Sequence, residues 1–289
     1  MHAFGERLAL DPGYLSFTEH GLVNKPEHHN VILVDGKGPV DYLTASFGWQ
    51  STPFDPPPAD GQAYLSDAID GAFADAATVR TSYGLAPARR SDIERRFVFA
   101  DDRYLAIFDR VASPGATPRT FTWLLHGNGG GTSGGTFEQT PSGGRWTRLL
   151  ARLDSGLAVA GATPSFAVST GQHEVPDRVL TTHSVLAASV VGDDVRSAQL
   201  VYPTRSTDAP PTIATVATTA GNALLLTDLG GDRRVLVLNR APAAPPLDAA
   251  PPGSGLAPIA TDGRHVVLDA HVDGALRLAW AEDATTLRY

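Results

Sequence analysis

Hydrophobic and polar residues alternate along much of the chain with the two-residue period of β-strands. The clearest pair of segments is 93–99 and 104–111, which flank Asp101-Asp102 and are predicted to form a β-hairpin. In the second segment, the residues from Tyr104 to Phe108 are apolar without interruption. Because successive side chains point to opposite faces of a sheet, we expect this strand to be buried on both faces.

Further short runs rich in β-branched and apolar residues recur between turn signals, with a spacing of roughly 8–12 residues. They span 7–10, 30–34, 64–69, 77–83, 121–125, 157–160, 165–169, 184–190, 198–202, 223–226, 234–238, 265–270 and 275–281. No sustained helical periodicity appears, and the one helical candidate, 67–78, suits a strand and a loop equally well. We therefore predict an all-β fold, a large antiparallel, supersandwich-like β-sandwich of many short strands.

Two proline-rich segments, 51–61 and 241–255, interrupt this pattern. We predict a β-sandwich over 1–240, an Ala/Pro-rich linker over 241–255, and a C-terminal β-hairpin over 256–289 that packs on the sandwich. The chain has 289 residues and is 42% hydrophobic, which is enough to bury a substantial core.

Composition excludes several classes of function. The formal net charge of −8 argues against non-specific nucleic-acid binding, which needs clustered Lys and Arg. The absence of cysteine excludes disulfides, thiolate zinc sites and cysteine nucleophiles. No apolar run is long enough to span a membrane. Residues 1–6 do not resemble a signal peptide, so we expect either a cytoplasmic protein or a true start upstream.

The densest group of histidines lies in the first thirty residues. Asp11 ends one predicted strand, and His28 and His29 open the next. Carboxylate oxygens and imidazole nitrogens are natural zinc ligands, and adjacent strands of one sheet would bring Asp11 and His29 together. The residues alone favour a plainer interpretation, in which Asp11 begins an Asp-Pro-Gly turn and the histidines lie at the surface.

Other candidates carry less chemistry. The glycine-rich segment 127–135 is not followed by Lys-Ser/Thr, so a hairpin loop is favoured over a phosphate-binding loop. His126 is interpreted as the cap of a strand end, and His173 and His183 have no recognisable partner. Arg95 and Arg96 are expected on solvated strand faces or in ion pairs.

Two segments at the start of the chain resemble the heparinase II/III-like family. Residues 5–13 match its pattern G-x-x-L-x-x-D-P-G, and residues 29–36 follow its pattern H-N-x-V-x-V-D-G. The hairpin predicted over 93–111 is similar to the next recognisable hairpin of that family. The resemblance extends to about residue 126 and is only general beyond it.

The resemblance implies an antiparallel β-sandwich that follows an N-terminal α/α-toroid in a periplasmic or secreted lyase. Such lyases cleave uronate-containing polysaccharides, heparin/heparan- or alginate-like, by β-elimination. We expect this chain to be the C-terminal domain, with an anionic polysaccharide and the toroid as its partners. As an isolated chain it is expected to be inactive, because the family draws its catalytic residues largely from the toroid.

The resemblance also implies site residues. Asp11 and His29 match two ligands of a structural zinc ion (Zn2+), whose third ligand belongs to an H-x-H motif just upstream and is not in this sequence. Tyr14 lies where the resemblance places an active-site tyrosine; alternatively, its ring packs beside the turn. Two other functions stay open, a non-catalytic carbohydrate-binding module and a structural β-sandwich of the cell envelope, because sandwiches host all of these.

Overall fold

The computed structural model describes most of the chain, and these residues form an all-β fold. The described residues are 1–13, 23, 25–38, 63–83, 90–115, 117–175, 179–216, 221–247, 256, 258–272 and 275–288. They contain antiparallel strands and two 3-10 turns, η2 (Pro26–His28) and η5 (Gly131–Ser133), and no α-helix. The prediction of an all-β sandwich is confirmed. Tyr14 and the connector 51–61 lie outside the described residues.

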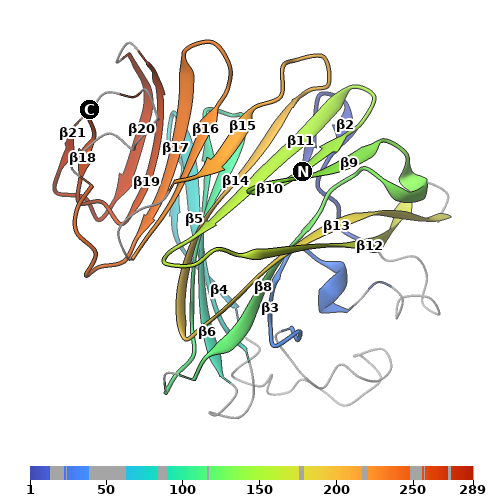
Figure 1. The fold of residues 1–289 in the computed structure, drawn as a ribbon, viewed down its shortest axis with the longest axis horizontal. Helices are drawn as coiled ribbons and strands as arrows, with labels where there is room; N and C mark the ends of the chain where they lie inside the picture. The colour runs from blue at the N-terminus through green and yellow to red at the C-terminus, as the bar shows by residue number, and fades with distance from the viewer. Residues whose placement is uncertain are drawn as a thin grey trace.

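The largest sheet has eight strands (Figure 1), in the order β4-β5-β6-β7-β14-β11-β10-β9. Their bounds are β4 Ala63–Ile69, β5 Ala74–Tyr83, β6 Ser91–Ala100, β7 Tyr104–Ala112, β14 Asp194–Arg205, β11 Ala151–Val159, β10 Gly143–Thr147 and β9 Thr136–Thr140. The predicted hairpin is β6 and β7, in which Ala100 pairs with Tyr104.

Two further sheets complete the layers. One has the order β12-β13-β8-β3, with β12 Ser165–Val175, β13 Val179–Gly192, β8 Arg119–His126 and β3 Ile32–Val34. The other has the order β15-β16-β17-β19-β20, with β15 Thr212–Thr215, β16 Asn222–Asp228, β17 Arg233–Arg240, β19 His265–His271 and β20 Leu276–Glu282. Two small pairs join β1 His2–Ala3 to β2 Glu6–Arg7, and β18 Ala260–Thr261 to β21 Leu287–Arg288.

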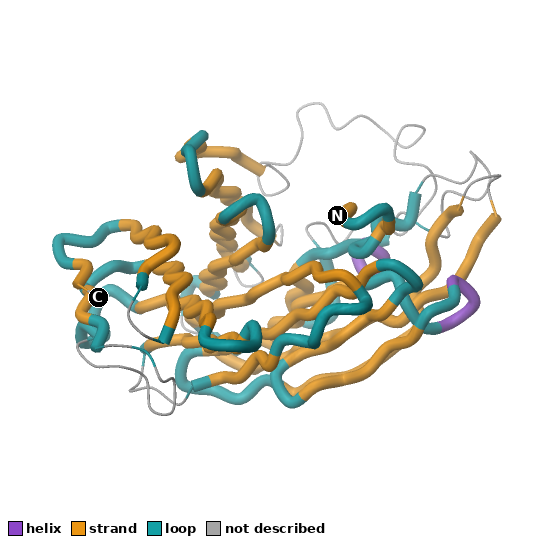
Figure 2. The backbone as a smooth tube through the Cα atoms, turned by 90° about the horizontal axis from the view of Figure 1, so that it is seen from above, coloured by secondary structure: helices purple, strands orange, loops and turns teal. Residues whose placement is uncertain are grey.

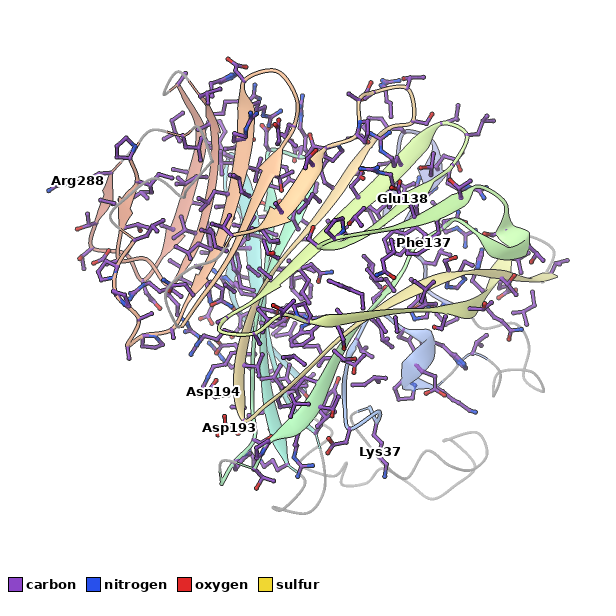
Figure 3. The ribbon with its side chains drawn as sticks, in the orientation of Figure 1. Lys37, Phe137, Glu138, Asp193, Asp194 and Arg288 are labelled. Atoms are coloured by element: carbon purple, nitrogen blue, oxygen red, sulfur yellow. The ribbon has the colours of Figure 1, made fainter. Side chains whose placement is uncertain are left out.

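The eight-stranded sheet packs against a different sheet on each face. Tyr104 and Phe108 of β7 share a core with Val237 of the five-stranded sheet. Ile107, on the opposite face of the same strand, shares a core with Leu186 of the four-stranded sheet. The prediction that this strand is buried on both faces is therefore confirmed. Side chains fill the space between the layers (Figure 3).

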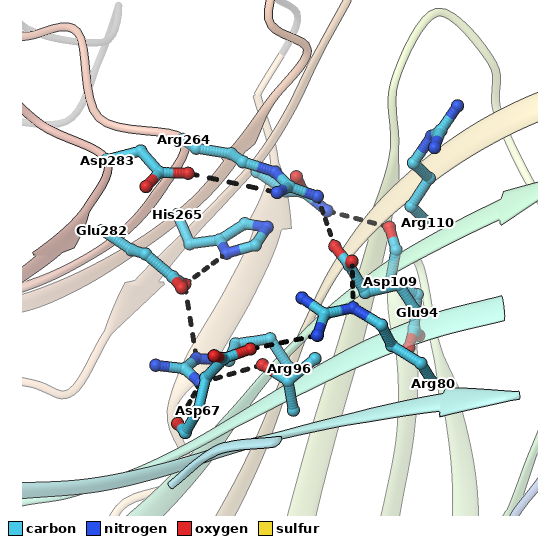
Figure 4. A network of polar contacts seen from close by, with 12 residues as sticks. Asp67, Arg80, Glu94, Arg96, Asp109, Arg110, Arg264, His265, Glu282 and Asp283 are labelled. Atoms are coloured by element: carbon cyan, nitrogen blue, oxygen red, sulfur yellow. Dashed lines mark hydrogen bonds and ion pairs between the residues drawn. The ribbon is translucent and has the colours of Figure 1, made fainter. Parts of the chain in front are cut away.

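Charged side chains also cross the contact between the eight- and five-stranded sheets (Figure 4). Arg264 donates to Glu94 of β6, and His265 Nδ1 lies 2.9 Å from a Glu282 oxygen. That carboxylate also lies 3.3 Å from Nε of the buried Arg96. These polar contacts tie the C-terminal strands, at one end of the molecule, to the central sheet (Figure 2).

The helical candidate 67–78 is resolved as two strands. β4 and β5 form a hairpin, and β5 pairs with β6 along its whole length, from Ala74 opposite Ala100 to Tyr83 opposite Ser91. Pairing with a long central strand satisfies the backbone of β5, which overrides its weak helical pattern. No helix in the described part of the chain is long and apolar enough to cross a membrane.

The strands on either side of the Ala/Pro-rich segment belong to one sheet. β17, which precedes it, pairs with β19, which follows it, from Arg233 opposite His271 to Asn239 opposite His265. The C-terminal hairpin of β19 and β20 thus extends a sheet begun by β16 and β17. Residues 248–255 of the predicted linker lie outside the described residues, and the domain boundaries at 240 and 256 stay a prediction.

Candidate functional site

The two predicted metal ligands lie side by side. Nδ1 of His29 is 3.0 Å from Oδ2 of Asp11, and both side chains are partly open to solvent. The backbone N–H of Gly13, at a φ of +86°, donates to Oδ1 of Asp11, so the Asp-Pro-Gly turn is present as well. Asn30 bonds the two segments together, because its side chain donates to the Leu10 carbonyl at 2.6 Å.

These two donors suit zinc in kind but do not complete a site. Zinc takes three or four protein ligands, commonly imidazole nitrogen and carboxylate oxygen. Within the part of the chain that the structure describes, no group of three or more His, Asp or Glu side chains is arranged to hold a metal. Asp11 and His29 therefore fit as part of a zinc site, and the zinc itself stays a prediction.

Three buried histidines form a hydrogen-bonded chain across the four-stranded sheet. They come from three adjacent strands: His173 from β12, His183 from the central β13 and His126 from β8. Nδ1 of His126 lies 2.9 Å from Nε2 of His183, and Nδ1 of His183 lies 2.9 Å from Nδ1 of His173. Gly171 faces His183 across the sheet, and a Cβ there would lie 2.6 Å from its ring, so the glycine makes room for the imidazole.

Burial keeps all three rings neutral at neutral pH. Desolvation lowers the pKa of His126 and of His173 to about 4 and that of His183 to about 3. Near His173, the positive charges of Arg7 and Arg148 lower the pKa of the ring further. A neutral imidazole has one donor and one acceptor nitrogen, so His183, which bonds to both neighbours, accepts one hydrogen bond and donates the other.

His173 also lines a cavity of about 290 Å³, near the lower end of the size range of ligand sites. The hairpin β1–β2, the glycine-rich loop and β12 form its walls, which include Glu6, Arg7, Asn128, Ser133, Arg148 and His173. Arg148 donates to the Ser133 carbonyl and lies 3.4 Å from Glu6, and Asn128 donates to the Arg7 carbonyl at 2.6 Å. Two guanidinium groups face one carboxylate, which gives this cavity an excess of positive charge.

Comparison with known proteins supports the fold assignment. No protein-family profile matches the sequence, and no curated protein matches it. Among solved structures, the heparan sulfate lyase HepC of Pedobacter heparinus matches with a TM-score of 0.58 and 15% identity, over 82% of this chain and 35% of that chain. A heparinase III structure matches with a TM-score of 0.57 and 9% identity, over 82% and 34% of the two chains.

The fold is heparinase-like. At these identities the likeness establishes the fold, and this chain spans about a third of the length of the matched lyases.

Within this heparinase-like sandwich, sequence reasoning missed the histidine chain. His126 is not merely the cap of a strand end, and His173 and His183, for which no partner was recognised, contact each other. The hairpin of β12 and β13 brings the last two together, since Thr181 pairs with His173 and Gly171 with His183. The register between β12 and β13 places the two rings on one face, and the only sequence signal for it is the even separation of ten residues between the two histidines.

Proposed function

We propose that this chain is the β-sandwich part of a lyase that cleaves uronate-containing polysaccharides by β-elimination. In this proposal it forms one wall of the substrate cleft, and an α/α-toroid domain supplies the rest of the catalytic machinery. The heparinase-like fold supports it, as does the coverage of only 35% of the heparan sulfate lyase HepC.

The observation that carries the proposal is the cationic cavity. The chain as a whole has a net charge of −8, yet the wall of this cavity has two guanidinium groups, Arg7 and Arg148, and one carboxylate, Glu6. Guanidinium groups bind carboxylate and sulfate oxygens through paired hydrogen bonds. β-Elimination requires neutralisation of the uronate carboxylate, a base and an acid. Arg7 and Arg148 are suited to the first of these tasks.

We further propose that Asp11 and His29 bind a zinc ion together with a ligand from outside the described residues. The metal would join the segment before β3 to the turn at Asp11. Its role would be structural, because bound zinc stabilises the folded state that presents its ligands.

Affinity for uronate oligosaccharides tests the lyase assignment. The substitutions Arg7→Gln and Arg148→Gln should each weaken binding of a heparan sulfate tetrasaccharide by about tenfold, the equivalent of roughly 1.4 kcal/mol. Arg110→Gln is the matched control, because Arg110 pairs with Asp194 at the surface, at 2.8 Å. Isothermal titration calorimetry measures each affinity.

An equal loss in the Arg110 control would mean that binding is non-specific and that the cavity is not the site. A folded protein that binds heparan sulfate and alginate oligosaccharides no better than a neutral oligosaccharide would contradict the lyase assignment and favour the structural alternative. Affinity without any unsaturated uronate product in the full-length protein would instead favour the carbohydrate-binding module.

A further inference from the structure

The three-histidine chain can exist in two neutral forms that differ in the position of every proton. In one form the protons are on Nε2 of His126, Nε2 of His183 and Nδ1 of His173. In the other they are on Nδ1 of His126, Nδ1 of His183 and Nε2 of His173. Both forms satisfy the two 2.9 Å hydrogen bonds, because each bond keeps one donor and one acceptor.

Conversion of the first form into the second moves protons without leaving a charge in the core. Nε2 of His173 takes up a proton from its surroundings, and the proton on its Nδ1 passes to Nδ1 of His183. The proton on Nε2 of His183 passes to Nδ1 of His126, whose Nε2 releases a proton. One proton enters and one leaves, so no buried ring becomes cationic, a state that desolvation makes costly.

The two outer histidines of the three, His126 and His173, have different surroundings. Nε2 of His126 is buried and makes no hydrogen bond to the described residues. The charged groups around that end are His28, His29 and Asp11. At the other end, His173 lines the cavity near Arg7 and Arg148, and the Thr181 hydroxyl lies 3.2 Å from its Nε2.

We propose that His126, His183 and His173 form a tautomeric relay, in which an anionic sugar group bound in the cavity draws a proton onto Nε2 of His173 and thereby reverses the tautomer of His126. A carboxylate or sulfate oxygen only accepts hydrogen bonds, so it selects the form with a donor at Nε2 of His173. Without the ligand, the Thr181 hydroxyl, 3.2 Å from Nε2 of His173, can donate to that nitrogen, which suits the form with the His173 proton on Nδ1. The relay therefore makes His173 a specificity-determining residue, and the inference rests on the proposed binding of anionic sugars.

Nitrogen NMR of the full chain tests the relay. Long-range correlations between ring protons and ring nitrogens identify the tautomer of each histidine in the ¹⁵N-labelled protein. We expect three neutral rings whose protons alternate as described, and we expect a heparan sulfate tetrasaccharide to reverse the tautomers of both His173 and His126. His271, which pairs with Asp232 at the surface, serves as the internal control and should not change.

The outcomes separate this inference from the proposed function. If the tetrasaccharide shifts the Arg7 and Arg148 side-chain signals but His126 keeps its tautomer, the relay is wrong and anionic-sugar binding stands. If those arginine signals do not shift, the proposed binding fails, and the ligand-driven relay fails with it. A cationic ring, or tautomers that do not alternate in the unliganded protein, would overturn the relay alone.

A variant that removes the middle histidine adds a second measurement. His183→Gln should leave the response of His173 to the tetrasaccharide and abolish the response of His126. If this variant does not fold, His126→Gln removes the histidine farthest from the cavity instead. Without the ligand, His173 should then show both neutral tautomers in place of one. A folded His126→Gln protein with an unchanged His173 spectrum would contradict the relay.

Discussion

Asp109 is a buried charge held by several donors at once. Its carboxylate lies 2.7 Å from Nε of Arg95 and accepts a hydrogen bond from the Trp123 indole at 2.7 Å. Arg96, the residue after Arg95 in β6, points to the opposite face of the sheet, where it donates to Thr78 and pairs with Glu282. The expectation of solvated faces is wrong for both arginines, because β6 is an interior strand with a sheet packed on each side, and the expectation of ion pairs is confirmed.

Removing the charge of Asp109 tests how much its ion pair with Arg95 contributes to the stability of the fold. Asp109→Asn leaves the Arg95 guanidinium without its counter-ion, and we expect the free energy of unfolding to fall by about 3–5 kcal/mol. The matched control is Asp194→Asn, which removes the exposed partner of Arg110 and should cost less than about 1 kcal/mol. Urea unfolding measures both values, and similar losses would show that burial does not strengthen the Asp109 pair.

The predicted zinc ligands can be tested against a second Asp–His pair of similar geometry. Asp11→Ala and His29→Ala should abolish stoichiometric zinc and lower the melting temperature of the full-length protein, because a bound metal stabilises the folded state. Asp232→Ala is the control, since Asp232 lies 3.0 Å from His271, as Asp11 does from His29. Unchanged zinc content and melting temperature in both site variants would show the metal assignment to be wrong.

At the level of elements, β13 is the strand that builds the candidate site. It lies between β12 and β8. Its His183 is therefore the only one of the three linked histidines that contacts both of the others. Its partner β12 contributes Gly171, where a Cβ would also come within 2.7 Å of a Val185 methyl group. The position of the His183 ring therefore depends on the residue opposite it.

Gly171→Ala should force His183 and Val185 to move. We expect a loss of about 1–3 kcal/mol in the free energy of unfolding, the usual cost of overpacking a core, and new ring signals for His126 and His173. Ser169→Ala, at an exposed position of the same strand, should change neither quantity. Equal stability of the two variants would mean that the ring has space to move.

At the scale of the whole molecule, the three neutral histidines make stability depend on pH. In the unfolded chain their pKa returns to about 6.5, whereas in the folded chain it is about 4 for His126 and His173 and about 3 for His183. Between these values the unfolded state binds more protons. Their contribution is therefore complete above pH 6.5 and is lost as the pH falls from 6.5 towards 4.

Denaturant titrations across this window measure the effect. We expect the free energy of unfolding to fall by about 1–3 kcal/mol between the two ends, discounted for partial solvent access and coupling among the rings. His183→Gln should flatten the pH dependence, whereas His271→Gln, which removes a partly exposed ring, should leave it in place. An unchanged slope in the His183 variant would show that other groups cause the acid sensitivity.

The sequence by itself indicated most of the long strands and the pairing of Asp11 with His29, but it missed β9, β10 and β15. An uninterrupted apolar run beside a turn signal, such as that of β7, indicates an extended segment with two apolar faces, and Asp-Pro-Gly ends a strand whatever surrounds it. Resemblance in short motifs then predicted that Asp11 and His29 lie together. These signals are local, because each depends on residues within one or two neighbouring strands.

Only the tertiary structure decided which faces are covered and where the candidate site lies. Arg95 and Arg96 look like surface residues until sheets pack on both faces of β6. The cavity draws Arg7, Arg148 and His173 from segments that are remote in sequence, and the histidine chain needs the register of two strand pairs. The two-residue period of a strand determines which side chains share a face. Which other side chains that face contacts depends on how the sheets stack and on the strand register, and both depend on contacts between segments that are distant in the sequence.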